Sequence, residues 1–124
     1  MSIRTATPAD IADMPTIYEH AVIYGTGSYE LDPPDEVELG RRFAHFTGSG
    51  FPWLVYEDRG MILGYAYGSP FRTRPAYRWM IEDSVYVAPE AKGKGIGKAL
   101  LIALIEECRK LGYHQIVAVI GDGQ

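Results

Sequence analysis

The chain has little of what builds disulfide frameworks, metal sites or membrane spans. It contains a single cysteine, Cys108, which excludes an intrachain disulfide and is typical of a reducing compartment. Its three histidines, His20, His45 and His114, are scattered without metal-ligand spacing. No apolar run approaches the roughly 20 residues of a membrane span, and residues 1–10 lack a signal-peptide core. These absences predict a metal-free cytoplasmic protein with no membrane partner.

The chain also has fewer positively charged residues than negatively charged ones. Lysine and arginine number 12 against 16 aspartates and glutamates, so the formal net charge is −4. Nucleic-acid-binding domains are usually basic, and we therefore expect no nucleic-acid partner. With 124 residues, 47% of them hydrophobic, the chain has the size and composition of one globular domain covering residues 1–124.

Hydrophobic periodicity predicts a mixed α/β fold. Extended or alternating patterns indicate strands at 2–6, 53–58, 61–69, 77–87 and 114–120, with a hairpin turn at 58–60. Helical spacing indicates a helix within 7–24, where either Thr7 or Asp13 could be the cap, and further helices at 35–46 and 97–111. The apolar stripe of the last helix comprises Leu100, Ala103, Leu104, Cys108 and Leu111. A strand, a glycine-rich turn, this helix and another strand follow in order, which favours parallel pairing of the two strands.

The stretch AKGKGIGKALL, residues 91–101, places three glycines on alternate positions directly at the predicted helix start. A helix N-terminus has unpaired N–H groups and a partial positive charge, and glycine lets an anion approach the main chain closely. Lys92, Lys94 and Lys98 add positive charge around the same opening. The pattern predicts a cradle for a phosphate or pyrophosphate. A plain strand-to-helix turn with solvated lysines is the alternative.

Two common phosphate-binding motifs do not fit this stretch. A P-loop ending at Gly97-Lys98 would need glycine in place of Lys92 and serine or threonine in place of Ala99. The dinucleotide pattern G-x-G-x-x-G starting at Gly93 would need glycine in place of Lys98. The pattern that remains is [Q/R]-x-x-G-x-[G/A], read here as Lys92-Gly93-Lys94-Gly95-Ile96-Gly97.

This pattern, preceded by VYVAPE and followed by an amphipathic helix, resembles the acetyl-CoA signature of the GCN5-related N-acetyltransferases, and the resemblance runs along essentially the whole chain. It implies an acyl-CoA N-acyltransferase fold with a mostly antiparallel central sheet, splayed where the cofactor enters. It further implies that the 92–98 loop binds the CoA pyrophosphate. The main chain of Val85, Tyr86 and Val87 would face the pantetheine arm and the thioester carbonyl. Lys92 stands where glutamine or arginine is usual, so we expect weaker binding.

Two further segments, RPAYRWMIEDSVYV and GTGSYELDPP, resemble the branch of that family that acetylates phosphinothricin and methionine sulfone or sulfoximine. The resemblance implies direct acetyl transfer, in a ternary complex, to the α-amino group of a small amino-acid analogue. It also implies a homodimer, the common state of that branch. Acetylation of a peptide or protein and non-catalytic acyl-CoA binding are the alternatives. The proline-pinned arginine loop disfavours the peptide, because a bulky acceptor needs an open groove.

The resemblance assigns the chemistry to the strand that precedes the glycines. Glu82 would be the general base that deprotonates the acceptor ammonium, directly or through water, with Asp83 as its nearest competitor. In an alternating strand, Glu82 shares a face with Tyr86 unless a bulge intervenes. The N–H of Val87 would donate to the developing oxyanion. A solvated strand glutamate is the alternative for Glu82.

The acceptor side is predicted from two loop segments. Arginine forks there could bind a carboxylate, phosphinate or sulfonyl group at two points, although solvated loop arginines are the alternative. The resemblance implies that the main chain of Pro75–Tyr77, the ring of Tyr77 and the segment SYE at 28–30 complete the acceptor pocket. Glu30 could accept a hydrogen bond from the substrate ammonium or have a plain loop role. The implied acceptor residues are Tyr29, Glu30, Arg72, Arg74, Pro75, Ala76, Tyr77 and Arg78.

Relatives in this branch continue past AVIGDGQ with another helix and further strands, which supply cofactor contacts and the group that protonates the departing thiolate. We therefore expect the domain to be C-terminally incomplete, and an isolated 124-residue chain to be inactive or marginally folded. The strand at 116–120 would otherwise be an apolar edge open to aggregation. Truncation, a separate C-terminal portion and a partner chain that completes the sheet are the three explanations.

Overall fold

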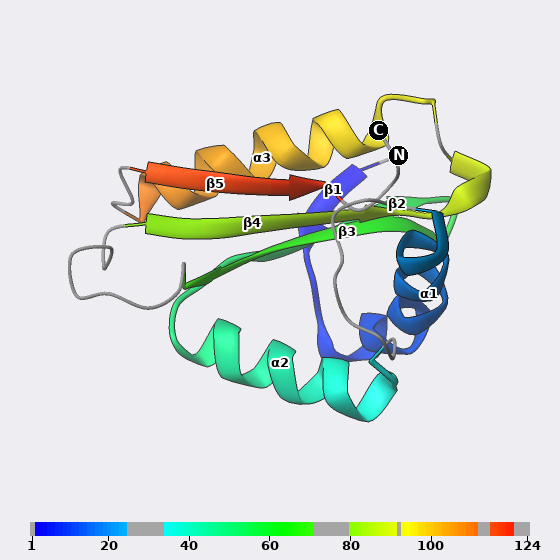
Figure 1. The fold of residues 1–124 in the computed structure, drawn as a ribbon, viewed down its shortest axis with the longest axis horizontal. Helices are drawn as coiled ribbons and strands as arrows, with labels where there is room; N and C mark the ends of the chain where they lie inside the picture. The colour runs from blue at the N-terminus through cyan, green and yellow to red at the C-terminus, as the bar shows by residue number, and fades with distance from the viewer. Residues whose placement is uncertain (1, 25–33, 71–79, 92, 112–114, 121–124) are drawn as a thin grey trace.

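The structure is a computed structural model that describes residues 2–24, 34–70, 80–91, 93–111 and 115–120. The elements, in chain order, are β1 (Ser2–Thr5), the 3-10 helix η1 (Pro8–Asp13), α1 (Met14–Tyr24), α2 (Glu36–Gly48), β2 (Trp53–Asp58), β3 (Met61–Pro70), β4 (Met80–Val87), the 3-10 helix η3 (Pro89–Ala91), α3 (Ile96–Lys110) and β5 (Gln115–Ile120) (Figure 1). The segment predicted as a helix within 7–24 is thus two elements, and of its two candidate caps Thr7 precedes η1 whereas Asp13 directly precedes α1. Thr7 and Asp10 form a capping box at the start of η1, and α1 begins only at Met14.

The strands form one sheet in the order β1-β2-β3-β4-β5. The first four pair antiparallel, whereas β4 and β5 pair parallel, which confirms the predicted strand arrangement around the last helix. The predicted hairpin between β2 and β3 is also confirmed. Its central residues Arg59 and Gly60 have φ values of 53° and 79°, as a two-residue type I′ turn requires.

Helices cover both faces of the sheet. In Figure 1, α3 lies on one face, while α1 and α2 lie on the other. Leu100, Leu104 and Cys108 of α3 are fully buried, which confirms most of the predicted stripe. Leu111 is 53% exposed, and its place in that stripe was wrong. It is the C-cap residue, one position beyond the last residue of α3.

The opposite face carries a stack of aromatic rings. The rings of Trp53 and Tyr67, which are cross-strand partners, lie 4.1 Å apart between centroids, and those of Tyr65 and Tyr86 lie 5.1 Å apart. Tyr18 of α1 packs 4.9 Å from Tyr86. Since side chains alternate along a strand, this stack fixes the orientation of β4, in which Tyr86 faces α1 and its neighbours in sequence face α3.

Ion pairs join the first strand to its neighbours. The guanidinium of Arg4 donates to both carboxylate oxygens of Asp10 at 2.8 and 2.9 Å, and to Glu57 of β2 at 2.8 Å. The hydrogen bonds from Arg4 lower the pKa of Asp10 from 3.8 to about 2. This network ties β1 and η1 to the sheet. Among the described helices, none is long and apolar enough to cross a membrane.

Candidate functional site

The glycine stretch lies where the sequence predicts it, at the start of α3. Gly95 is the N-cap residue, and the first main-chain bond of the helix runs from the N–H of Ala99 to the carbonyl of Gly95, at 3.0 Å. The N–H groups of Ile96, Gly97 and Lys98 precede that bond and therefore have no acceptor within the helix. Gly95 has no side chain, so the N-cap residue itself supplies no acceptor for them. Three donors at the positive end of a 15-residue helix are thus available to an anion.

Glycine is required at two positions of this loop by the backbone itself. Gly93 and Gly95 have φ values of 79° and 77°, which other residues adopt only with strain. A Cβ built on either glycine meets no heavy atom within 4 Å. The space above the loop is therefore open, and Lys94 and Lys98 border it as exposed cations. Lys92, the first residue of the predicted signature, lies outside the described residues.

The strand before the loop presents one N–H group of particular interest. The register of β3 and β4 is continuous from Gly64 opposite Val87 to Pro70 opposite Ile81, so this pairing contains no bulge. The N–H of Ala88 donates to the carbonyl of Leu63 at 2.8 Å, and antiparallel bonds alternate between directions. The N–H of Val87 therefore points away from β3, toward the side of β4 on which β5 lies.

The described part of β5 ends at Ile120, two residues short of the partner position of Val87 on β4. The last described pair is Val85 with Ile120, and in Figure 1 β4 runs on past the tip of β5 toward the start of α3. The Val87 N–H thus points toward the β5 side beyond that pair. Tyr86 and Val87 lie at the same end of the sheet as the glycine loop, so the predicted cofactor strand and cofactor loop come together.

The structure tests other predicted residues only in part. For Glu82 and Asp83 it describes the strand positions alone: Glu82 lies opposite Ser69 on β3 and Val117 on β5. Because the register has no bulge, position 82 has the same strand parity as Ser84 and Tyr86. The predicted acceptor residues, Tyr29, Glu30, Arg72, Arg74, Pro75, Ala76, Tyr77 and Arg78, lie outside the described residues.

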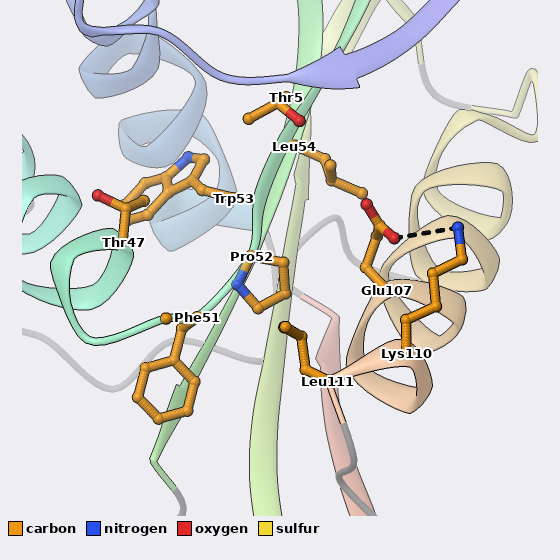
Figure 2. Close-up of a pocket in the computed structure, with 10 residues that line it drawn as sticks. Thr5, Thr47, Phe51, Pro52, Trp53, Leu54, Glu107, Lys110 and Leu111 are labelled. Atoms are coloured by element: carbon orange, nitrogen blue, oxygen red, sulfur yellow. Dashed lines mark ion pairs between the residues drawn. The ribbon is translucent and has the colours of Figure 1, made fainter.

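A cavity of about 340 Å³ lies elsewhere, between the loop that enters β2 and the C-terminal end of α3 (Figure 2). Phe51, Pro52 and Leu54 line it together with Leu111, and the ion pair between Glu107 and Lys110, 3.4 Å long, borders it. The first cavity-lining residue of α3, Glu107, lies eleven residues after Ile96, so about 16 Å of helix separates this cavity from the glycine loop. It contains none of the predicted site residues.

Sequence reasoning left the aromatic stack unassigned. Tyr65 and Tyr67 alternate in the segment GYAY, and this period of two could have placed both rings on one face of the sheet. The pairing with Trp53 and Tyr86 depends on the strand register, which no local pattern supplies. Within the described ranges, no group of three histidine, cysteine or acidic side chains could hold a metal ion.

Comparison with known proteins gives the family of this chain. It is 43% identical over 121 residues to a phosphinothricin N-acetyltransferase of Alcaligenes faecalis, an alignment that covers 98% of this chain and 61% of that protein. It is 38% identical over 123 residues to an L-methionine sulfoximine/L-methionine sulfone acetyltransferase of Salmonella typhimurium, covering 97% of this chain and 70% of that protein.

Among solved structures, a GNAT superfamily phosphinothricin acetyltransferase from Sinorhizobium meliloti, in complex with AcCoA, shares the fold with a TM-score of 0.89 and 49% identity. This alignment covers 97% of the present chain and 65% of that one. The chain thus spans less than two thirds of the Alcaligenes and Sinorhizobium proteins. Residues 14–123 match the acetyltransferase (GNAT) family. The resemblance drawn from the glycine signature is confirmed, and the chain belongs to the GNAT acetyltransferase family.

Proposed function

We propose that this protein transfers an acetyl group from acetyl-CoA to the α-amino group of a small amino-acid analogue of the phosphinothricin or methionine sulfone type. The observation that carries the proposal is the open glycine loop at the start of α3, beside the end of β4. That arrangement offers donors for an anion and, at the end of β4, an N–H that points away from β3 toward the β5 side, within one end of the sheet. The named activities of the similar proteins support the substrate class.

The residues at the start of α3 fit the pyrophosphate of acetyl-CoA. The N–H groups of Ile96, Gly97 and Lys98 have no acceptor within the helix, and the open space over Gly93 and Gly95 lets the main chain contact an anion. Lys94 and Lys98 supply positive charge at the entrance, and Lys92 completes the signature. When bound, acetyl-CoA supplies an activated acetyl thioester.

The end of β4 is suited to orienting the acetyl group. Main-chain groups of Val85 and Val87 point to the β5 side of the strand, and the last described β4–β5 pair ends at Val85. We assign the N–H of Val87 as the donor to the acetyl oxygen as negative charge develops there. A donor fixed in a sheet needs no reorganisation during the reaction, and removing such a donor from an enzyme typically lowers kcat about 100- to 1000-fold.

Glu82 is proposed as the general base. An amino acid carries an ammonium group at neutral pH, and its nitrogen becomes nucleophilic only after a proton is removed. Position 82 has the same strand parity as Tyr86, because the register of β4 is continuous, and we propose that the Glu82 carboxylate acts on the sheet face that Tyr86 occupies. The carboxylate would accept the ammonium proton on that face of the sheet. Val87 at the end of β4 and the glycine loop at the start of α3 would hold acetyl-CoA, the other reactant.

The acceptor is proposed to be small, and the arginine-bearing segment at 72–78 together with Tyr29 and Glu30 is proposed to surround it. Arginine binds carboxylate and phosphinate oxygens through paired N–H donors, which suits an amino-acid analogue with an oxygen-rich side chain. A homodimer is part of the same proposal, taken from the branch that the sequence resembles.

Thiol release from acetyl-CoA tests the proposal directly. The protein is incubated with acetyl-CoA and, in separate reactions, with phosphinothricin, methionine sulfone, methionine or a peptide with a free N-terminus. Release that depends on phosphinothricin or methionine sulfone supports the proposal. Release with the peptide alone would instead make the protein a peptide acetyltransferase. Acetyl-CoA binding seen by calorimetry, without thiol release from any acceptor, would make it a non-catalytic acyl-CoA-binding module.

A further inference from the structure

Gly64 in β3 is a glycine that the backbone does not require. Its φ lies outside the left-handed region in which glycine is favoured, in contrast to Gly93 and Gly95. Glycine in the middle of a strand is usually unfavourable, because it has no side chain to pack and loses more entropy on folding. Its presence here therefore needs a reason in the packing.

The reason is the close approach of three atoms to the space where a side chain would be. A Cβ on Gly64 would lie 2.9 Å from the main-chain oxygen of Tyr86, 3.0 Å from Cδ1 of Leu100 and 3.5 Å from Cγ2 of Ile96. The first two distances are shorter than a carbon atom tolerates without movement of its neighbour. Leu100 could rotate, but the oxygen of Tyr86 is held in the sheet between β3 and β4.

These three atoms belong to the two elements that the proposed function uses. Tyr86 directly precedes Val87, whose N–H is the proposed oxyanion donor, and Gly64 is the strand partner of Val87. Ile96 is the first residue of α3, and Leu100 lies one turn later. Ile96 is 4% exposed and Leu100 is fully buried, so neither side chain has solvent to move into.

We propose that Gly64 is a positioning residue for the acetyl-CoA site. Its missing side chain lets the first turn of α3 pack directly on the β3–β4 pair. That packing sets the separation between the free amides at 96–98 and the N–H of Val87. Gly64 itself would touch no reactant. The inference rests on the proposed function, since it concerns the spacing of two groups that would hold the two ends of one long cofactor.

The test is Gly64→Ala, with Gly40→Ala as the matched control. Gly40 also has an ordinary φ, lies in α2, and a Cβ built on it meets no atom within 4 Å. Since overpacking by one methyl group perturbs a buried contact appreciably, we expect Gly64→Ala to raise the Kd for acetyl-CoA about tenfold. The KM for acetyl-CoA should rise more than the KM for the acceptor. Gly40→Ala should change neither constant.

A second variant separates positioning from folding. Leu100→Val removes Cδ1, one of the two crowded atoms, so the double variant Gly64→Ala/Leu100→Val should bind acetyl-CoA more tightly than Gly64→Ala alone. Where Gly64→Ala does not fold, the double variant is compared with Leu100→Val, and weaker binding by the double variant supports the inference. A folded alanine variant whose acetyl-CoA affinity equals that of its glycine parent overturns it. A wild-type protein that binds no acetyl-CoA overturns the proposed function itself.

Discussion

Gly95→Ala tests the anion cradle because the chain offers an almost identical substitution elsewhere. Gly95 has a φ of 77° at the start of α3, and Gly60 has a φ of 79° in the β2–β3 turn. A Cβ meets no atom within 4 Å at either position. The two alanine variants therefore introduce the same backbone strain without a steric clash. Each should lose about 1 kcal/mol of stability, the typical strain of a non-glycine residue in the left-handed region.

The two variants should differ in acetyl-CoA binding. At Gly95 the new methyl group would project into open space beside the amides of 96–98, where the pyrophosphate is proposed to bind. Losing one hydrogen bond to a charged group removes about 1.5–3 kcal/mol, which corresponds to a Kd roughly 10- to 150-fold higher. At Gly60 the methyl group lies in a hairpin turn, and the Kd should stay unchanged.

Urea unfolding measures the free energy of unfolding of each variant, and isothermal calorimetry measures its Kd for acetyl-CoA. The expected result is an equal loss of unfolding free energy in both variants and a higher Kd in Gly95→Ala alone. Equal acetyl-CoA affinities for Gly95→Ala, Gly60→Ala and the parent protein would refute the assignment of this loop as the pyrophosphate site. A higher Kd in both variants would show that strain, and not the position of the methyl group, is responsible.

Two further substitutions test separate parts of the molecule. Asp10→Asn should lose about 2 kcal/mol at neutral pH, since a pKa lowered from 3.8 to about 2 favours the folded state by that amount. This contribution is complete above about pH 4 and disappears as the pH falls through 2, so urea unfolding curves of the parent and Asp10→Asn proteins should converge in acid. Asp13→Asn, at an exposed position, is the control and should change the unfolding free energy by no more than about 0.5 kcal/mol at neutral pH. Glu82→Gln should cut kcat sharply in the thiol-release assay while calorimetry finds the acetyl-CoA affinity nearly intact, and equal turnover would remove Glu82 from the mechanism.

The parts of the fold that follow from short-range patterns could be predicted from the sequence. The glycines before an amphipathic run located the start of α3 to within one residue, and the strand that follows the helix indicated the parallel pair. The segment at 7–24 was harder, because its apolar spacing is continuous across η1 and α1, and both Thr7 and Asp13 could serve as the cap. Leu111 was wrongly assigned to the buried stripe of α3, because hydrophobic periodicity does not show where a helix ends relative to the sheet that it covers.

The site was less accessible to sequence reasoning where it depends on contacts between distant segments. The crowding at Gly64 involves atoms of Tyr86, Ile96 and Leu100, which are more than 20 positions away along the chain. Nothing in the segment ILGYAY distinguishes this glycine from one that merely weakens a strand. In the same way, the direction of the Val87 N–H depends on the phase of the hydrogen bonds between β3 and β4, which the structure fixes through Ala88 and Leu63.

The burial of Cys108 has a practical consequence for these experiments. It is the single cysteine of the chain and is fully covered in the core between α3 and the sheet. A thiol reagent must reach the sulfur to react, so the native protein should contribute almost no background when free CoA is detected by disulfide exchange. A slow additional reaction of one thiol per chain would then show that α3 separates from the sheet and exposes Cys108. The same reagent would therefore measure both turnover and opening of the core in a single assay.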